Sequence, residues 1–223
     1  MQRGKSEEII IPDPELTVKT VCGFCNNGWM GKLEEENIPI IGSMFQGLTL
    51  PLDRGQQEKV AKWAMKSSMV LDSMRPRVNN SRFYTREECV TMREGLGIPT
   101  RTRIWIGRMD SMHLHAGGTD FISKTVDGDN PIVHASNATF VAGHFVVQVA
   151  TQHTMQGFDD AINPDLAPKP GDWDRKLIQI WPVEREWVEW PPQAAFTNGG
   201  LEGIRVFTGS LADRREGRSS QSK

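Results

Sequence analysis

The spacing of apolar residues changes near residue 99, and this change limits the possible folds more than any other feature of the chain. Between Asp53 and Met74, apolar residues recur every three or four positions, as on one face of an amphipathic helix. Beyond residue 99 the apolar segments are rich in β-branched and aromatic residues, which favours strands. These segments are 101–108, 139–150, 177–181 and 186–190. The sequence therefore predicts an α+β fold, with helices first and a mostly antiparallel, β-rich region after them.

Local signals place the ends of the other elements. Asp53 carries the side chain of an N-cap for the long helix, and the pair Arg75-Pro76 is expected to end it. The other elements are a predicted strand over 16–21, a helix over 29–36 that Pro39 ends or kinks, a connector over 45–52, a helix over 85–94 and a last helix over 198–211.

Charge and composition restrict the partners and the compartment. The chain carries 26 Lys and Arg against 28 Asp and Glu, a formal charge of −2. A domain that binds nucleic acid usually has a basic footprint, so such a role would need a local patch here. No apolar run is long enough to cross a bilayer, and the N-terminus lacks the apolar stretch of a signal peptide, so no membrane partner is expected. The three cysteines do not make a disulfide framework, and the predicted compartment is the cytoplasm.

The feature that carries chemistry is the pair Cys22 and Cys25. Two cysteines at this spacing can direct both thiolates at one zinc ion, and Gly23 eases the turn between them. A structural zinc site takes four ligands, so the pair alone is half a site. The alternative is a redox-active pair, which would normally follow a strand in a thioredoxin-like βαβ unit. No such unit is predicted around Cys22, so we expect metal binding.

The residues after the pair narrow the interpretation. The run Cys22-Gly-Phe-Cys25-Asn26-Asn27-Gly28-Trp29-Met30, with Leu33-Glu34, resembles the second half of the zinc knuckle in a bacterial and phage family of HNH endonucleases. The likeness extends over most of residues 17–195, through the segments 56–72, 104–108, 144–149, 180–182 and 190–192. The resemblance implies that Cys22 and Cys25 hold a structural zinc ion and that Asn26 is the polar residue of the motif, near an active metal. It further implies hydrolysis of nucleic-acid phosphodiester bonds, with magnesium or another divalent ion as the catalytic metal.

The chain departs from that family in one respect. The family has an earlier C-x-x-C and a Glu-His pair that supplies the catalytic base, whereas here no cysteine precedes Cys22 and no histidine precedes His113. No catalytic residue can be carried over, and the chain as given is expected to be inactive. Three explanations stay open: a truncated reading frame, a natural remnant that keeps a binding role, or ligands from a second protomer or from Cys89 plus a histidine. The alternative function is a non-catalytic zinc-knuckle module that binds a protein or ligand partner.

The remaining candidate residues carry weaker signals. Arg101 and Arg103 alternate onto one face and could contact a phosphate backbone, although a solvated charged face is commoner. His113 and His115 have a spacing that suits a metal on a strand, but their neighbours predict a turn. The aromatic residues Trp181, Trp187 and Trp190 could stack on bases, although filling the core is the commoner use. By domain, the sequence predicts a partial knuckle segment over 1–50, an α+β domain of unknown role over 51–212 and a disordered tail over 213–223.

Overall fold

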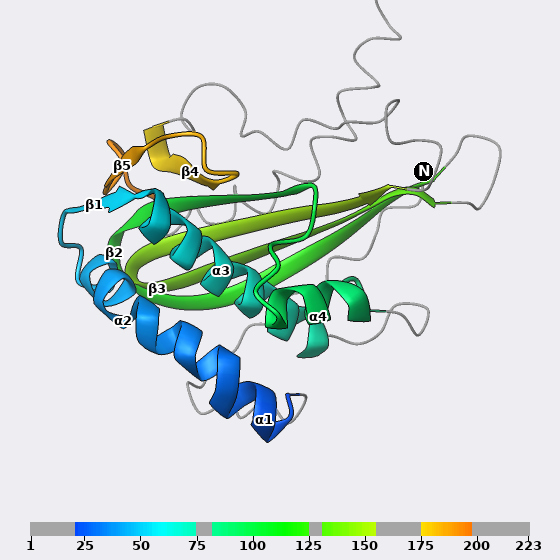
Figure 1. Cartoon of the computed structure of the whole chain (residues 1–223). Helices are drawn as coiled ribbons and strands as arrows, with labels where there is room; N and C mark the ends of the chain where they lie inside the picture. The colour runs from blue at the N-terminus through cyan, green and yellow to red at the C-terminus, as the bar shows by residue number, and fades with distance from the viewer. Residues whose placement is uncertain (1–20, 75–81, 125–130, 155–174, 198–223) are drawn as a thin grey trace, which may run out of the picture.

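The computed structural model describes residues 21–74, 82–124, 131–154 and 175–197, and confirms the α+β prediction (Figure 1). The helical elements are α1 (Gly23–Cys25), the π-helix η1 (Asn26–Met30), α2 (Gly31–Phe45), α3 (Arg54–Met74) and α4 (Arg86–Arg93). The strands are β1 (Leu50–Asp53), β2 (Thr102–Lys124), β3 (Pro131–Thr154), β4 (Leu177–Trp181) and β5 (Trp187–Trp190). The predicted last helix, the tail and all but the end of the first predicted strand lie outside the described residues. None of the helices described is both long and apolar enough to span a membrane.

Helix α3 forms where the apolar spacing predicts it. Its start is fixed by a reciprocal pair of hydrogen bonds, in which Gln56 N donates to Asp53 Oδ1 at 2.7 Å and Asp53 N donates to Gln56 Oε1 at 3.0 Å. The predicted N-cap is therefore confirmed. Helix α3 is described as far as Met74, and Arg75-Pro76, the pair expected to end it, lie outside the described residues. Its apolar face is buried against the sheet and α2; the buried residues include Val60, Ala61, Ala64, Met65 and Leu71.

Helix α2 continues through Pro39 to Phe45, so the prediction that Pro39 would end or kink the helix near that point placed its end too early. Proline removes one backbone donor, but Pro39 and Glu35 both lie on the exposed side, where water can pair with the freed carbonyl. The opposite side of α2 is buried through Ile40 and Met44. The helix is thus held by its packing against α3 rather than by the propensity of each residue.

The strands β2 and β3 form one long antiparallel ribbon, far longer than the predicted segments. The turn expected around His113 and His115 was wrong, because both residues lie within β2, opposite Gly143 and Val141. The register shifts between Arg108 and His113, which marks a β-bulge. Glycine, serine and aspartate in this stretch resemble turn residues, but they sit in the bulge and in the paired strand beyond it.

The ribbon doubles back on itself near this bulge. Two parts of β3 that are distant along the strand meet at Gln148. Its Nε2 donates to Asn137 Oδ1, and its Oε1 accepts a hydrogen bond from Thr139 Oγ1 at 2.6 Å. Gly143, between them, has a φ of 60°, a left-handed conformation that favours glycine. Figure 1 shows the turn of the ribbon at the end nearest α2 and β1. A single pair of strands thereby builds two facing layers.

Two smaller pairings complete the fold. Strand β4 pairs antiparallel with β2 on the side away from β3, and β1 pairs antiparallel with β5 in a separate two-stranded sheet. Strand β1 lies in the segment predicted as a connector. No local signal marks it as a strand, because its four residues include a proline and its pairing partner is remote in sequence. The main core lies between α3 and one face of the sheet, and a second cluster forms around Trp105, Met109 and Phe196.

Candidate metal centre

The structure places Cys22 and Cys25 on one turn at the start of a helical arm formed by α1, η1 and α2. Cys22 is the N-cap of α1, and its Sγ accepts a hydrogen bond from the backbone N–H of Cys25 at 3.4 Å. Both residues are free thiols, Cys22 exposed and Cys25 partly buried. The two thiols of the predicted pair therefore lie close together on one turn, which is the first condition for sharing a metal.

The surroundings of the two thiols favour ionisation of Cys22 first. The backbone N–H of Cys25, followed by the hydrogen bond between the two side chains, lowers the pKa of Cys22. That same side-chain hydrogen bond and partial burial raise the pKa of Cys25, while the positive charge of Arg93 on α4 acts in the opposite direction. A metal dication binds thiolates rather than thiols. A bound metal would therefore favour loss of the proton from both cysteines, and from Cys22 most readily because its pKa is already lowered.

The indole of Trp29 supplies a test of whether the pair fits a metal. Its Nε1 is buried, and among the described residues no acceptor meets the distance and angle of a hydrogen bond to it. It nevertheless lies near enough to Cys25 to lower the pKa of that thiol. A zinc-bound thiolate accepts hydrogen bonds from outer donors, and such donors raise metal affinity. Two soft sulfur ligands with a nearby N–H donor suit a zinc ion, and Cys22 and Cys25 are the residues that would hold it.

At this candidate centre only two side chains that could bind one metal come together in the described residues, Cys22 and Cys25. All three cysteines and all five histidines of the chain lie within the described residues. Among these residues no three His, Cys, Asp or Glu side chains come close enough to hold a metal, so Cys89 with a histidine does not complete the site. Asn26 is exposed, and its Nδ2 donates to Asn27 Oδ1 at 3.4 Å. In the part of the chain that the structure describes, Cys22 and Cys25 are thus two thiols without a third metal-binding side chain beside them.

The two arginines predicted to contact nucleic acid lie far along the chain from this pair, at the start of β2. Arg101 is partly buried in a left-handed conformation with a φ of 59°. Arg103 is also partly buried, and its Nη1 donates to Gln179 Oε1 at 3.3 Å. Their role in binding phosphate stays a prediction.

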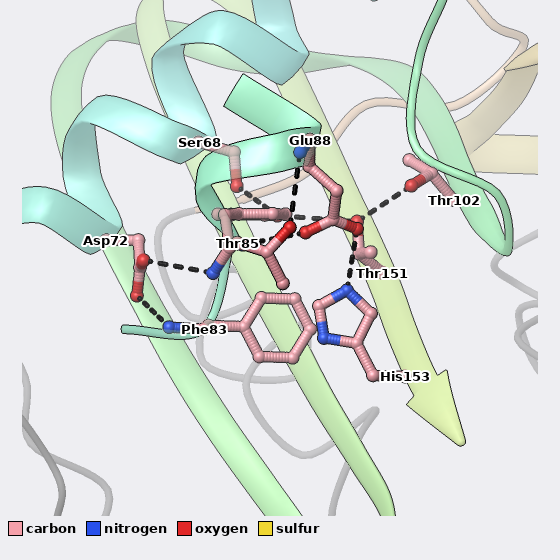
Figure 2. A network of polar contacts seen from close by, with 9 residues as sticks. Ser68, Asp72, Phe83, Thr85, Glu88, Thr102, Thr151 and His153 are labelled. Atoms are coloured by element: carbon pink, nitrogen blue, oxygen red, sulfur yellow. Dashed lines mark hydrogen bonds and ion pairs between the residues drawn. The ribbon is translucent and has the colours of Figure 1, made fainter. Parts of the chain in front are cut away.

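Sequence reasoning missed a second cluster, in which a histidine–carboxylate pair joins α4 to the end of β3 (Figure 2). His153 Nε2 lies 2.8 Å from Glu88 Oε1, and the imidazole stacks on Phe83 with ring centroids 4.3 Å apart. His134, from the other end of β3, meets the same phenyl ring edge-on at 4.7 Å. The doubling back of β3 is what brings the two histidines to one aromatic ring.

Beside this pair runs a chain of buried hydroxyl groups. Tyr84 OH lies 2.9 Å from Ser68 Oγ and donates to Thr151 Oγ1 at 3.3 Å, and Thr151 Oγ1 is 2.9 Å from Thr102 Oγ1 (Figure 2). The buried Asp72 carboxylate accepts the backbone N–H groups of Phe83 and Tyr84, both at 3.3 Å. These bonds satisfy polar groups that burial would otherwise penalise. The cluster therefore anchors the segment before α4 to the sheet.

Only part of this cluster has a sequence signal. Thr85 and Glu88 form a capping box, because Glu88 N donates to Thr85 Oγ1 and Thr85 N donates to Glu88 Oε2. That spacing is visible in the sequence, but the partner His153 is not, because it comes close only through the pairing of the end of β3 with the start of β2. A further histidine of β3 is held by the fold in a similar way, since His144 Nδ1 lies 2.9 Å from Met109 O.

Replacing Glu88 with glutamine is expected to flatten the acid side of the stability profile. Burial alone would raise the pKa of Glu88, but hydrogen bonds from His153 and Thr85 outweigh it and lower that pKa. A lowered pKa in the folded state gives stability that is present above the ordinary pKa of glutamate, about 4.3, and is lost as pH falls through the lowered value. Glutamine keeps the capping box and removes the charge. Urea unfolding between pH 7 and pH 3 measures the change.

The matched control is Glu87→Gln, which removes an exposed charge from the same helical turn without touching His153. Its unfolding free energy should follow the pH dependence of the native chain. An unchanged acid slope in Glu88→Gln would show that the histidine–carboxylate pair contributes nothing to stability.

Comparison with known proteins adds no relative: no family model matches the chain, and no curated protein or solved structure does either.

Proposed function

We propose that this chain is a zinc-binding protein of the HNH-endonuclease type whose substrate is nucleic acid. By itself, the chain does not cleave that substrate. The observation that carries the proposal is the turn on which the backbone N–H of Cys25 donates to Cys22 Sγ, with the buried indole N–H of Trp29 beside the Cys25 thiol. The zinc would be structural, since both protein ligands found are thiolates and neither can act as a general base toward water. Free thiols at an exposed site fit the cytoplasm, which we propose as the compartment.

Hydrolysis of a phosphodiester needs a base that activates water and a metal that stabilises charge on the phosphate. The resemblance to HNH endonucleases supplies no base for this chain, and the described residues group no ligands for magnesium. The pair His153 and Glu88 has the chemistry of a base with its orienting carboxylate, but its ring stacks on the buried Phe83 and lies in the anchor of α4. A complete nuclease would therefore need the missing Glu-His segment from outside this sequence.

Zinc titration tests the proposal directly. Purified under reducing conditions, the chain should bind Zn²⁺, and Co²⁺ in its place should show the thiolate-to-cobalt charge-transfer absorption. Cys22→Ser and Cys25→Ser should each lower zinc affinity by more than about 100-fold, because each removes a direct ligand. Cys89→Ser, which changes an exposed thiol on α4, is the matched control and should bind zinc like the native chain. Plasmid DNA incubated with the chain and magnesium should stay intact.

Two results would contradict this proposal. Nicking of the plasmid by the purified chain would show that it carries a complete catalytic site. Absence of zinc binding, with ready reversible formation of a Cys22–Cys25 disulfide in a glutathione buffer, would favour thiol redox chemistry in its place.

A second candidate is a non-catalytic zinc-knuckle module for a protein partner. It is supported by the apolar residues that the helical arm exposes, Phe24 at 83% and Ile38 at 66%, because such side chains suit a protein surface better than a phosphate backbone. Salt dependence separates the two candidates. Binding to DNA that weakens steeply with salt supports the nucleic-acid function, whereas a zinc-loaded chain that binds no DNA at low salt supports the protein-binding module.

A further inference from the structure

We propose that two copies of this chain join their Cys22–Cys25 pairs around one zinc ion, so that each copy supplies half of a four-thiolate site. This inference rests on the proposed zinc binding and names the source of the missing ligands. It begins from the ligand count, since every cysteine and histidine of the sequence lies in the described residues and no third one joins the pair. Two copies of a two-thiolate half-site give the four ligands that structural zinc takes.

The position of the pair allows a second copy to approach. Cys22 caps α1 and Cys25 is its last residue, and α1 is the end of the helical arm farthest from β1 (Figure 1). Cys22 is exposed and Cys25 is partly exposed, so neither sulfur is closed off by the chain's own sheet. A contact of the same residues from both copies is isologous, which gives a closed two-fold dimer rather than a fibre.

The surface between the two cysteines is apolar and uncharged. Phe24 stands between them with 83% of its surface exposed, the largest exposure among the apolar side chains described. The segment 22–30 contains no charged residue, so two copies of it can meet without repulsion between like charges. In a two-fold contact each Phe24 would be covered by the other copy, which removes apolar surface from water.

The indole N–H of Trp29 gives each half-site a buried donor. Two copies bring two such groups, which can hydrogen-bond to zinc-bound thiolates.

The experiment measures molar mass and bound zinc together, using the full chain under reducing conditions. Light scattering after size-exclusion chromatography should give a monomer in a chelator and a dimer after zinc is added, with one zinc per two chains by elemental analysis. Cys22→Ser should stay monomeric with zinc, and Cys89→Ser should dimerise like the native chain. Phe24→Ser, which leaves all thiols in place, should weaken zinc-dependent dimerisation by about 10-fold or more, since it removes the apolar contact. Circular dichroism of each variant checks its folding.

The possible outcomes separate this inference from the zinc binding on which it rests. One zinc per chain in a monomer would leave the proposed zinc site standing and overturn the shared site. Binding of no zinc would overturn both. A dimer that persists in chelator, or that forms in Cys22→Ser with zinc, would place the interface elsewhere and overturn the shared site alone.

Discussion

A Gly143→Ala variant is expected to lose about 2–5 kcal/mol of unfolding free energy, from about 1–2 for the left-handed backbone and about 1–3 for overpacking. Gly143 has a φ of 60°, and a Cβ placed there would lie 2.4 Å from Phe45 O and 2.8 Å from two ring atoms of Phe45. A carbonyl oxygen at the end of α2 cannot turn away as a flexible side chain can. The bend of β3 must therefore open, or α2 must shift, before the methyl group fits.

Urea unfolding followed by circular dichroism measures this loss. The matched control is Gly42→Ala on α2, where an added Cβ meets nothing within 4 Å and the glycine is helical. Because alanine favours the helix, that variant should be more stable by up to about 1 kcal/mol. Equal stability of Gly143→Ala and the native chain would mean that α2 does not press on the bend of β3 in solution.

Removing the indole of Trp190 is the second change with a large expected effect. Trp190→Ala should cost about 3–5 kcal/mol, as is usual when a buried aromatic side chain is cut back to a methyl group. Trp190 is 0% exposed, is among the largest fully buried side chains described and donates from Nε1 to Gly107 O at 3.2 Å. The variant therefore leaves a cavity in the main core and an unpaired carbonyl on β2.

Trp187, on the same strand, is the control for Trp190 because it is 59% exposed. Trp187→Ala should change the free energy of unfolding by less than about 0.5–1 kcal/mol. Far-UV circular dichroism is the measurement for both, since each variant removes a fluorophore. Similar losses in the two variants would contradict the burial difference. The pair also tests the expectation that these tryptophans fill the core, which the structure confirms for Trp190 and not for Trp187.

The sequence alone predicted those elements whose determining residues are close together along the chain. Helix α3 follows from the apolar spacing and from Asp53 as its cap, and both short strands β4 and β5 follow from their β-branched and aromatic residues. Helix α4 follows from Thr85 and its capping box. In each case the residues that decide the structure are neighbours, so one stretch of sequence contains the whole cause.

What the sequence did not predict depends on contacts between remote residues. The strand character around His113 comes from pairing with Gly143 and Val141, and this tertiary context outweighs the turn-forming residues nearby. Likewise, the contact of Glu88 with His153 depends on the pairing of the end of β3 with the start of β2. Cys22 and Cys25 lie on one turn, as their spacing predicts, whereas the effect of Arg93 on Cys25 depends on how α4 packs.

The pairing of β1 with β5 ties an early strand to one made much later, with Leu50 opposite Trp190. During synthesis at about 5–20 residues per second, β1 waits on the order of 10 s for its partner to leave the ribosome. Throughout that time Leu52, which is fully buried in the finished protein, lacks the strand that completes its surroundings. A nascent chain in this state offers an unpaired strand edge to chaperones or to other nascent chains. Strand β5 thus closes a sheet that β1 began much earlier in synthesis.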